Sequence, residues 1–506
     1  VDLIENLPPK TIFFNAGGNA RNNNIIPLPL IYDPKSEYKF APPSEKEWSQ
    51  LILASFIGSD TNPVRTMLDM YLFNNPDFRI TIQKWTPILD PIAISNFMES
   101  ILSSRYILAP SGYGPTSFRF YEAFQHNKIP VYIHDGKGPF LPYNDIIDWR
   151  KCCIIIDENE IQKLPQILGN ITYAQYIEML TYYNKFHEQL FTIKGVASYI
   201  TDFVATLYEN EAWKAQTVAC IANKSAYNDL IIMLKSLELF NLVPPTIYLY
   251  CDSFVDKEIK NVKYNGIIKT KIELNKYSGI SRKEMETTPV ILKHDGVEYE
   301  LNLFTEFVLL KLEAIRWALT ETQSGVYFSD TDICYFAPLP NIKNTKYKVL
   351  LSPHYIKPDY EAKFGFFNAG FLWLCDKEVL DMWFKASMTS TFFEQKSLET
   401  VSEYFKEKDS ILYADMNVNY GWWRLFDGRK PVGDQIKEWN RRLPGFLNSG
   451  IYVKGKPLQS VHTHFFDTTY QIGAFNKYLF SVFSKYQYYP VIALLATIKN
   501  ILESSQ

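Results

Sequence analysis

The stretch SGVYFSDTDICYF, residues 324–336, places two aspartates one residue apart directly after a short apolar run. The run has the composition of a buried strand. The segment before it, FTEFVLLKLEAIRWALTE, repeats apolar residues at the spacing of an amphipathic helix. A helix that leads into a buried strand is typical of an α/β fold with a parallel sheet. Ligands of such folds bind at the carboxyl ends of the strands, where the sequence places Asp330 and Asp332.

The two carboxylates predict a site for a divalent metal and a diphosphate. On an extended segment, side chains separated by one residue point the same way. Such a pair suits a hard cation, manganese or magnesium, whose other positions are filled by water and phosphate oxygens. An isolated Asp-x-Asp is weak evidence, because it more often lies in a solvated loop or a helix cap. Its position after a predicted helix and strand favours the metal site.

Strand-like and helical segments alternate twice along the chain. Between residues 50 and 210, the segments LILASFIGS, RYILAPSG, IPVYIHD and CCIIID read as strands with helical segments between them. A second alternation starts near residue 216 with QTVACIAN and PTIYLYCDS. A chain of 506 residues is too long for one ordinary core. We therefore predict an α/β protein with domains over residues 1–210 and 211–485 and a C-terminal helix over 486–506.

Composition excludes some classes of protein. The chain is 47% hydrophobic and 21% charged, which is globular rather than disordered. A net charge of −3 without a long basic block argues against nucleic acid as the main partner. Aromatic residues make up 16%, which suits sugar-binding surfaces but also follows from the codons of an A/T-rich genome. Composition leaves both explanations open.

Cysteine usage and hydropathy give expectations about location. Six cysteines lack CxxC and metal-ligand spacing, which favours reduced thiols and a reducing compartment such as the cytoplasm. No signal peptide and no apolar run of about eighteen residues is visible, so no transmembrane helix is expected. The segment YYPVIALLATIKNIL reads as a terminal packing helix, with an interfacial membrane anchor and peripheral membrane association as the alternative. Five cysteines are expected in strands: Cys152, Cys153, Cys220, Cys251 and Cys334.

Three segments of the second alternation resemble the GT-A glycosyltransferases. That nucleotide-sugar fold carries an Asp-x-Asp after about its fourth strand, as SDTD does here. The segment FFNAGFLWL, residues 366–374, looks like the Asn-x-Gly-Phe segment of many such enzymes, especially retaining ones. VHTHFF, residues 461–466, looks like the C-terminal His segment that completes the metal site. The resemblance covers residues 216–480 and implies a metal-dependent transferase that uses a nucleotide sugar, expected to be a UDP-sugar.

The GT-A resemblance implies a ligand set and a donor site. Asp330 and Asp332 would bind the metal, with His462 or His464 as the third ligand, because residues two apart face the same side of a strand. As ordinary structural residues, the two histidines would lie in the core or at the surface. The donor sugar would be approached by Asn368 and Gly370.

Further positions follow from the same resemblance. Asp415 lies where many relatives have an Asp–Gln pair, but the Gln is missing here, so its catalytic role is in doubt. Asp252 would accept a hydrogen bond from the uracil N–H. Lys311 and Arg316 would neutralise the diphosphate, although a lone helix cation is more often just solvated. The nucleotide pocket would also include Ala222 and Asn223.

A phosphate-binding turn is predicted in the first domain. Gly112 and Gly114 lie between a strand and a helix in APSGYGPTSFRFYEAF. A helix N-terminus offers free N–H groups and the positive end of a dipole to a phosphate. Arg119 would add a bidentate donor, and Glu122 would accept from ribose hydroxyls. A Gly-x-Gly turn is weak by itself, because structural left-handed caps are commoner.

The longer string PSGYGPTSFRFYEAFQHNKIPVYI closely resembles the exostosin family of inverting GT-B glycosyltransferases. The family pattern is P-x-G, then S-(F/Y)-R-(F/L)-x-E-A, then G-x-(I/V)-P-V. Asn127 replaces the last glycine, at a position expected to be left-handed. NIIPLPLIYDP and LASFIGSDTNPVR match two further family segments. The resemblance covers residues 10–205 and implies donor binding by Arg65, Gly112, Gly114, Ser117, Arg119 and Glu122.

Only the second half of a GT-B enzyme fits into the first domain. The other half normally carries the acceptor side and the catalytic base, and Asp60 and Asp135 are merely nearby carboxylates. The leading hypothesis is a two-module hexosyl- or pentosyltransferase with two donor sites that extends a glycan. Alternatively, the GT-A module alone is active and the first module is a scaffold or binds the acceptor. A non-catalytic glycan-binding protein is the third alternative, which the intact Asp-x-Asp disfavours.

Overall fold

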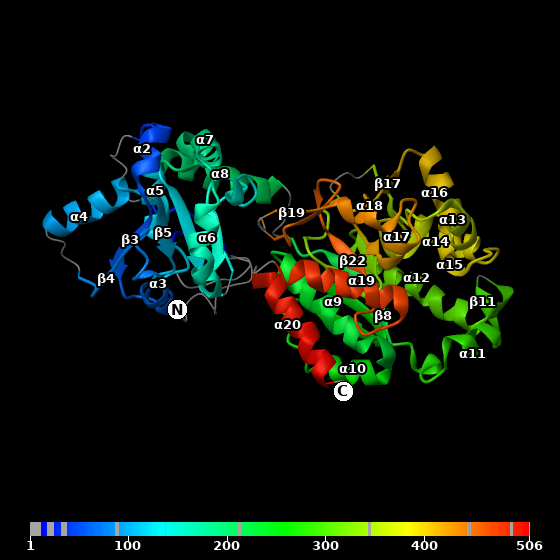
Figure 1. The fold of residues 1–506 in the computed structure, drawn as a ribbon. Helices are drawn as coiled ribbons and strands as arrows, with labels where there is room; N and C mark the ends of the chain where they lie inside the picture. The colour runs from blue at the N-terminus through cyan, green and yellow to red at the C-terminus, as the bar shows by residue number, and fades with distance from the viewer. Residues whose placement is uncertain are drawn as a thin grey trace. The chain divides into compact units, whose positions relative to one another are not determined.

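The computed structural model describes residues 12–17, 25–31, 38–86, 91–136, 138–209, 214–294, 296–342, 346–442, 445, 447–485 and 489–504. The chain divides into two compact units: unit 1 is formed mainly by Val1–Glu209, and unit 2 by most of the residues from Asn210 onward. Each unit has a sheet built largely of parallel strands with helices packed on it (Figure 1). The predicted α/β class is therefore confirmed.

The main sheet of unit 1 has the strand order β4-β3-β5-β6-β7, and every neighbouring pair is parallel. Because β4 lies on one side of β3 and β5 on the other, the winding reverses between the carboxyl ends of β3 and β5. Its strands are β3 (Ile52–Ser59), β4 (Phe78–Gln83), β5 (Ser104–Pro110), β6 (Ile129–His134) and β7 (Ile154–Asp157), besides the small parallel pair β1 (Phe13–Asn15) and β2 (Ile25–Pro27).

Helices bury both faces of this sheet. Along β6, Val131 and Ile133 pack into one hydrophobic cluster, and Tyr132 between them packs into the cluster on the other face. A strand buried on both sides is apolar throughout, which explains the IPVYIH run. The helices are α2 (Glu45–Gln50), α3 (Pro63–Leu72), α4 (Pro91–Leu102), α5 (Phe118–Gln125), α6 (Leu164–Gly169), α7 (Tyr173–Leu190) and α8 (Ile193–Glu209), with 3-10 turns η1 (Trp149–Lys151) and η2 (Glu158–Lys163).

The main sheet of unit 2 has the order β10-β9-β8-β13-β16-β15-β17, in which β16 runs antiparallel to both of its neighbours. The winding reverses between β8 and β13, and β13 is the fourth strand of this sheet along the described chain, as predicted. The strands are β8 (Thr217–Ala222), β9 (Thr246–Cys251), β10 (Ile268–Ile272), β13 (Val326–Ser329), β15 (Val349–Pro353), β16 (Phe367–Leu374) and β17 (Ile411–Tyr413).

Smaller elements complete unit 2. A second sheet has the order β14-β22-β18, formed by β14 (Ile333–Tyr335), β22 (Ser460–His462) and β18 (Tyr420–Gly421). Other strands are β11 (Pro289–His294), β12 (Val297–Asn302), β19 (Trp439–Arg441), β20 (Ile451–Val453) and β21 (Lys456–Pro457). The helices are α9 (Tyr227–Phe240), α10 (Ser253–Ile259), α11 (Arg282–Thr287), α12 (Leu303–Thr322), α13 (Pro358–Phe364), α14 (Lys377–Ser387), α15 (Phe393–Lys396), α16 (Leu398–Glu407), α17 (Trp422–Phe426), α18 (Val432–Lys437), α19 (Tyr470–Phe483) and α20 (Tyr489–Ser504), with 3-10 turns η3 (Lys224–Ala226) and η4 (Asn275–Tyr277).

Helix α12 delivers the chain into β13, as the apolar spacing predicts. The Asn302 side chain accepts a hydrogen bond from the backbone N–H of Thr305 and so caps the first turn. Leu312 and Ile315 pack with Phe328 of β13 in one hydrophobic cluster. The helix ends where Gln323 adopts the left-handed conformation, φ 52°. The residues that carry the aspartates are thus anchored by both a capped helix and a buried strand.

Two local expectations are wrong. Residues 330–332 form a turn rather than an extended segment, because the chain leaves the main sheet after β13 and enters β14 of the second sheet. Cys152 and Cys153 precede β7 instead of lying in it. All six cysteines are free thiols, as expected. The structure also confirms the left-handed conformation expected of Asn127, whose φ is 55°.

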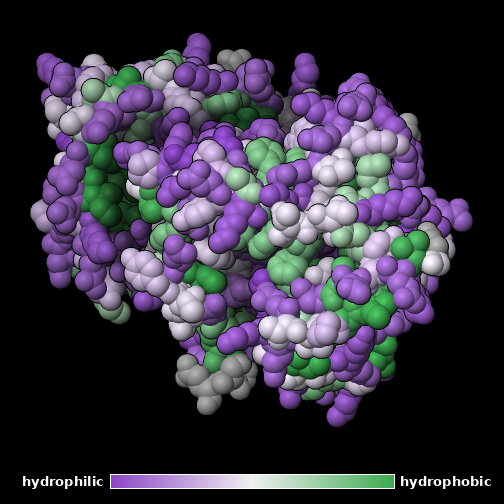
Figure 2. Space-filling view, turned by 90° about the vertical axis from the view of Figure 1, so that its right-hand side faces the viewer, coloured by the Kyte–Doolittle hydropathy of each residue, from purple (hydrophilic) through white to green (hydrophobic). Residues whose placement is uncertain are grey.

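The helices and the surface bear on whether the chain could enter a membrane. None of the helices in the described part of the chain is long and apolar enough to span a membrane alone; α7 and α8 reach that length and composition only together, with a bend of 75° between them. On the face shown in Figure 2, hydrophilic residues predominate and hydrophobic residues gather in separate patches.

Candidate functional site

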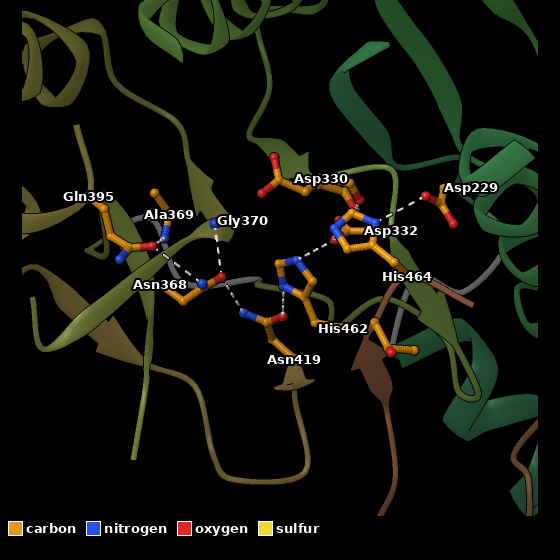
Figure 3. A network of polar contacts seen from close by, with 12 residues as sticks. Asp229, Asp330, Asp332, Asn368, Ala369, Gly370, Gln395, Asn419, His462 and His464 are labelled. Carbon is orange, nitrogen blue, oxygen red and sulfur yellow. Dashed lines mark hydrogen bonds and ion pairs between the residues drawn. The ribbon is translucent and has the colours of Figure 1, made fainter. Parts of the chain in front are cut away.

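Asp330, Asp332 and His462 bring three possible ligand atoms within 4.8 Å of one another (Figure 3). The two aspartates follow β13, and His462 ends β22. Strand β22 pairs antiparallel with β14, with His462 opposite Ile333, so His462 lies beside the residue that follows Asp332. His462 Nε2 is 3.0 Å from Asp332 Oδ2. The pairing of two strands from distant parts of the chain therefore builds the cluster.

His464 reaches the same carboxylate from the solvent side. Its Nε2 lies 3.3 Å from Asp332 Oδ2 and its Nδ1 lies 3.2 Å from Asp229 Oδ2, while 53% of its side chain is exposed. The hydrogen bond with Asp229 raises the pKa of His464 to about 9. Both predicted histidines thus contact Asp332, but the buried His462 is the one that belongs to the three-residue cluster.

Lys311 supports Asp330 from inside the protein. Its buried Nζ lies 3.2 Å from Asp330 Oδ1 and 2.9 Å from Glu394 Oε1 on α15. Burial alone would lower the pKa of Lys311, but the charges of Asp330 and Glu394 hold it above its usual value. Burial raises the pKa of Asp330 despite the lysine. Lys311 therefore orients Asp330. The sequence had predicted that Lys311 would contact a diphosphate, and it gave no sign of this contact with Asp330.

Gly370 on β16 lies at the centre of the cluster. Its carbonyl accepts a hydrogen bond of 2.7 Å from the backbone N–H of Asp330. A Cβ atom at this position would lie 2.6 Å from Asp330 Oδ2 and 2.6 Å from His462 Cε1. Glycine is required by the close packing of these two side chains.

Asn368 lies two residues before Gly370 and is 7% exposed. Its Oδ1 accepts hydrogen bonds from the backbone N–H of Gly370 and from Asn419 Nδ2. Its Nδ2 lies near His354 Nε2 and Gln395 Oε1. The amide is therefore held by protein groups, and its predicted contact with the donor sugar stays a prediction.

Two predicted residues form ion pairs away from the cluster. Arg316 pairs with Asp381 on α14, because it lies five positions from Lys311 and so about 140° away around α12. Asp415 forms an exposed ion pair with Lys456. Asn419, four residues further along, hydrogen-bonds into the cluster instead.

The predicted nucleotide residues lie at the carboxyl ends of β8 and β9. Asn223 follows Ala222, the last residue of β8, and its Oδ1 accepts from the backbone N–H groups of Ser225 and Ala226. Asp252 is 2% exposed, and its two oxygens accept from the N–H groups of Lys224 and Val255. These contacts tie together two loops at the edge that carries Asp330. Recognition of uracil by Asp252 stays a prediction.

In unit 1, Arg65 joins the two strand ends between which the winding reverses. Its Nη1 donates to the carbonyl of Ser59, the last residue of β3, at 2.8 Å, and its Nε donates to the carbonyl of Ser111, which follows β5, at 3.2 Å. Burial and the charge of Arg119 lower the pKa of Arg65 to about 10. A surface pocket beside this point is lined by Asp60, Thr61, Asn62, Pro63, Thr66, Met67 and Met70.

Arg119 and Glu122 form an ion pair on the first turns of α5. Arg119 Nη1 donates to Glu122 Oε2 at 2.5 Å, and its Nε donates to the carbonyl of Ile57 at 2.9 Å. Glu122 is only 3% exposed. Ser117 caps the helix by accepting from the N–H of Arg119. Arg119 is thus paired with a buried carboxylate, and its charge also acts on Arg65.

Both glycines of the predicted phosphate turn are explained by packing. A Cβ on Gly114 would lie 1.8 Å from the carbonyl oxygen of Gly17. A Cβ on Gly112 would lie 2.5 Å from Arg65 Nη2. The two glycines therefore let the carbonyl of Gly17 and the guanidinium of Arg65 pack closely against the turn. Nothing in the sequence indicated the contact with Gly17.

Comparisons with known proteins concern the first unit most directly. Residues 11–171 match the exostosin GT47 domain. A probable glycosyltransferase of Arabidopsis thaliana is 32% identical over 131 residues, which are 26% of this chain and 24% of that protein. Exostosin-1a of Danio rerio is 36% identical over 76 residues, 15% of this chain and 10% of that protein. The chain thus spans a quarter or less of these relatives.

Among solved structures, the glycosyltransferase GlyE of Streptococcus pneumoniae matches with a TM-score of 0.35 and 12% identity, over 58% of this chain and 64% of that one. A match at this level carries no argument about the activity of this chain. The family match lies in the first unit and associates that unit with glycosyltransferases.

Proposed function

We propose that this chain is a glycosyltransferase whose second unit binds Mn²⁺ or Mg²⁺ through Asp330, Asp332 and His462. The convergence of these side chains where the parallel sheet reverses its winding is the observation that carries the proposal. Two carboxylate oxygens and one imidazole nitrogen suit Mn²⁺, and both aspartates are partly exposed, so a diphosphate can approach.

The proposed chemistry is the transfer of a sugar from a nucleoside diphosphate to a glycan. A divalent ion would neutralise the charge that develops on the leaving diphosphate. Lys311 holds Asp330 in its orientation, and Gly370 leaves the space that Asp330 and His462 share. We expect a UDP-sugar as the donor, bound along the edge formed by the ends of β8, β9 and β13.

For unit 1 we propose a second donor site at the ends of β3 and β5. The similarity to the exostosin GT47 domain and the paired cations Arg65 and Arg119 support it. Arginine suits a diphosphate, because its planar group donates two parallel hydrogen bonds. The alternative, a scaffold or acceptor-binding module, is favoured by the guanidinium hydrogen bonds to backbone carbonyls and by the Gly17 carbonyl against Gly114.

Metal removal tests the proposed activity of unit 2. The chain is incubated with a panel of UDP- and GDP-sugars, with and without a glycan mixture, and release of the nucleoside diphosphate is measured. We expect release that stops in EDTA and returns with Mn²⁺ in excess, because the leaving group needs charge neutralisation. Donor consumption that EDTA leaves unchanged would contradict the metal site.

Arg119→Gln tests the donor site of unit 1. In EDTA, which disables the metal site, UDP binding by calorimetry is expected to weaken about tenfold or more, because one charge-assisted contact to phosphate is lost. Arg79→Gln is the control, since Arg79 is exposed and pairs with Glu99. Equal UDP affinity in the wild type and both variants would favour the scaffold alternative.

A further inference from the structure

We infer that Asn419 is a positioning residue: together with Asn368 it fixes the tautomer in which His462 carries its hydrogen on Nδ1 and presents Nε2 to Asp330 and Asp332. The consequence for metal binding rests on the function proposed above. The tautomer itself follows from hydrogen bonds within the protein (Figure 3).

A backbone N–H group fixes the orientation of the side-chain amides of Asn368 and Asn419. The N–H of Gly370 can only donate, and it lies 3.0 Å from Asn368 Oδ1, which must therefore be an oxygen. Asn419 Nδ2 lies 2.9 Å from the same oxygen and must be the donating nitrogen. The other terminal atom of Asn419 is then its oxygen, which faces the ring of His462.

The histidine tautomer follows from that oxygen. His462 Nδ1 lies 3.0 Å from Asn419 Oδ1 and must donate, because an amide oxygen only accepts. Nε2 lies 3.0 Å from Asp332 Oδ2, which also only accepts, so without metal this carboxylate competes with Asn419 for the hydrogen of the neutral ring. When Nδ1 holds that hydrogen, Nε2 keeps the lone pair that a metal requires. The arrangement places the ligand atom of His462 toward the carboxylates.

A second backbone group, the carbonyl of Gly365, leads to the same orientation of the Asn368 amide through His354. His354 Nδ1 lies 2.8 Å from the carbonyl of Gly365, which only accepts, so His354 Nε2 carries a lone pair in the neutral ring. Burial lowers the pKa of His354 to about 4, which keeps this ring neutral. Asn368 Nδ2, 3.3 Å from His354 Nε2, can therefore donate. Two independent backbone groups thus give Asn368 one orientation.

The surroundings of Asn419 hold it in place. It is 0% exposed, its backbone N–H donates to Ser460 Oγ on β22, and its φ is 51°. Asparagine tolerates this left-handed conformation better than most residues. The buried guanidinium of Arg424 donates to the carbonyls of Met416 and Val418 and fixes the preceding loop. Asn419 therefore has a fixed backbone as well as a fixed amide.

Asn419→Gly is the test variant, because glycine accepts a positive φ and removes only the amide. The position of the His462 hydrogen is read from long-range ¹H–¹⁵N spectra of ¹⁵N-histidine-labelled chain without metal, at a pH where the ring is neutral. His462→Gln assigns the signals. We expect the Nδ1–H form in the wild type and a mixture of tautomers in Asn419→Gly. Mn²⁺ affinity by calorimetry should fall about 10- to 100-fold.

Asn417→Gly is the matched control, since Asn417 lies in the same loop and its Nδ2 donates to the carbonyl of Pro457. It should keep both the tautomer and the affinity. If Asn419→Gly does not fold, Asn368→Ala on β16 removes the orienting oxygen and should also give mixed tautomers. An Nε2–H form in the wild type, or an unchanged tautomer in both variants, overturns the inference. Failure of the wild type to bind Mn²⁺ would instead refute the proposed function, while the spectra still test the tautomer.

Discussion

The double replacement Asp330→Asn and Asp332→Asn is expected to reduce metal-dependent transfer by about 10²- to 10³-fold or more. The two carboxylates supply both anionic ligands of the cluster, and amide oxygens bind divalent cations much more weakly. Without the ion, the charge on the leaving diphosphate would be poorly stabilised. The measurement is the initial rate of UDP release from the best donor at saturating Mn²⁺.

The double variant should remain folded, which a thermal melt checks. Lys311 loses its partner Asp330 but keeps Glu394, whose Oε1 lies 2.9 Å from Nζ. Asp381→Asn is the control, because Asp381 is exposed and pairs with Arg316 away from the cluster. Transfer that persists from every donor in a folded double variant would place the catalytic site elsewhere, with unit 1 as the remaining candidate.

Gly370→Ala is expected to abolish measurable Mn²⁺ binding or weaken it by at least about 10²-fold. The new methyl group would lie 2.6 Å from Asp330 Oδ2 and from His462 Cε1, so both ligands must move apart. The shift also disturbs Asn368 Oδ1, 2.9 Å from the same Cβ position. Overpacking of this kind costs about 1–3 kcal/mol of stability. Calorimetric Mn²⁺ titration and a thermal melt measure the two effects.

Gly433→Ala on α18 is the matched control for the added methyl group. A Cβ at Gly433 meets no atom within 4 Å, so metal affinity should stay at the wild-type value. If Gly370→Ala binds Mn²⁺ as tightly as the wild type, the ion is not held between Asp330 and His462, and the proposed ligand set is wrong.

Local patterns predicted much of the fold. The spacing in FTEFVLLKLEAIRWALTE predicted α12, and the apolar run after it predicted β13. The left-handed conformation of Asn127 followed from its replacement of a family glycine. These features depend on residues close in sequence, so propensity and periodicity were sufficient. The roles of Ala222, Asn223, Asp252 and Arg316 toward a nucleotide stay predictions.

The sequence by itself determined the α/β class and the position of an aspartate pair at the end of a buried strand, because both are encoded by neighbouring residues. The tertiary structure alone chose His462 over His464 for the cluster, through the pairing of β22 with β14. It also brought Glu394 and Asn419 to the site and made Gly370 indispensable. These contacts join residues far apart in the chain, and only packing in three dimensions can decide which of them meet.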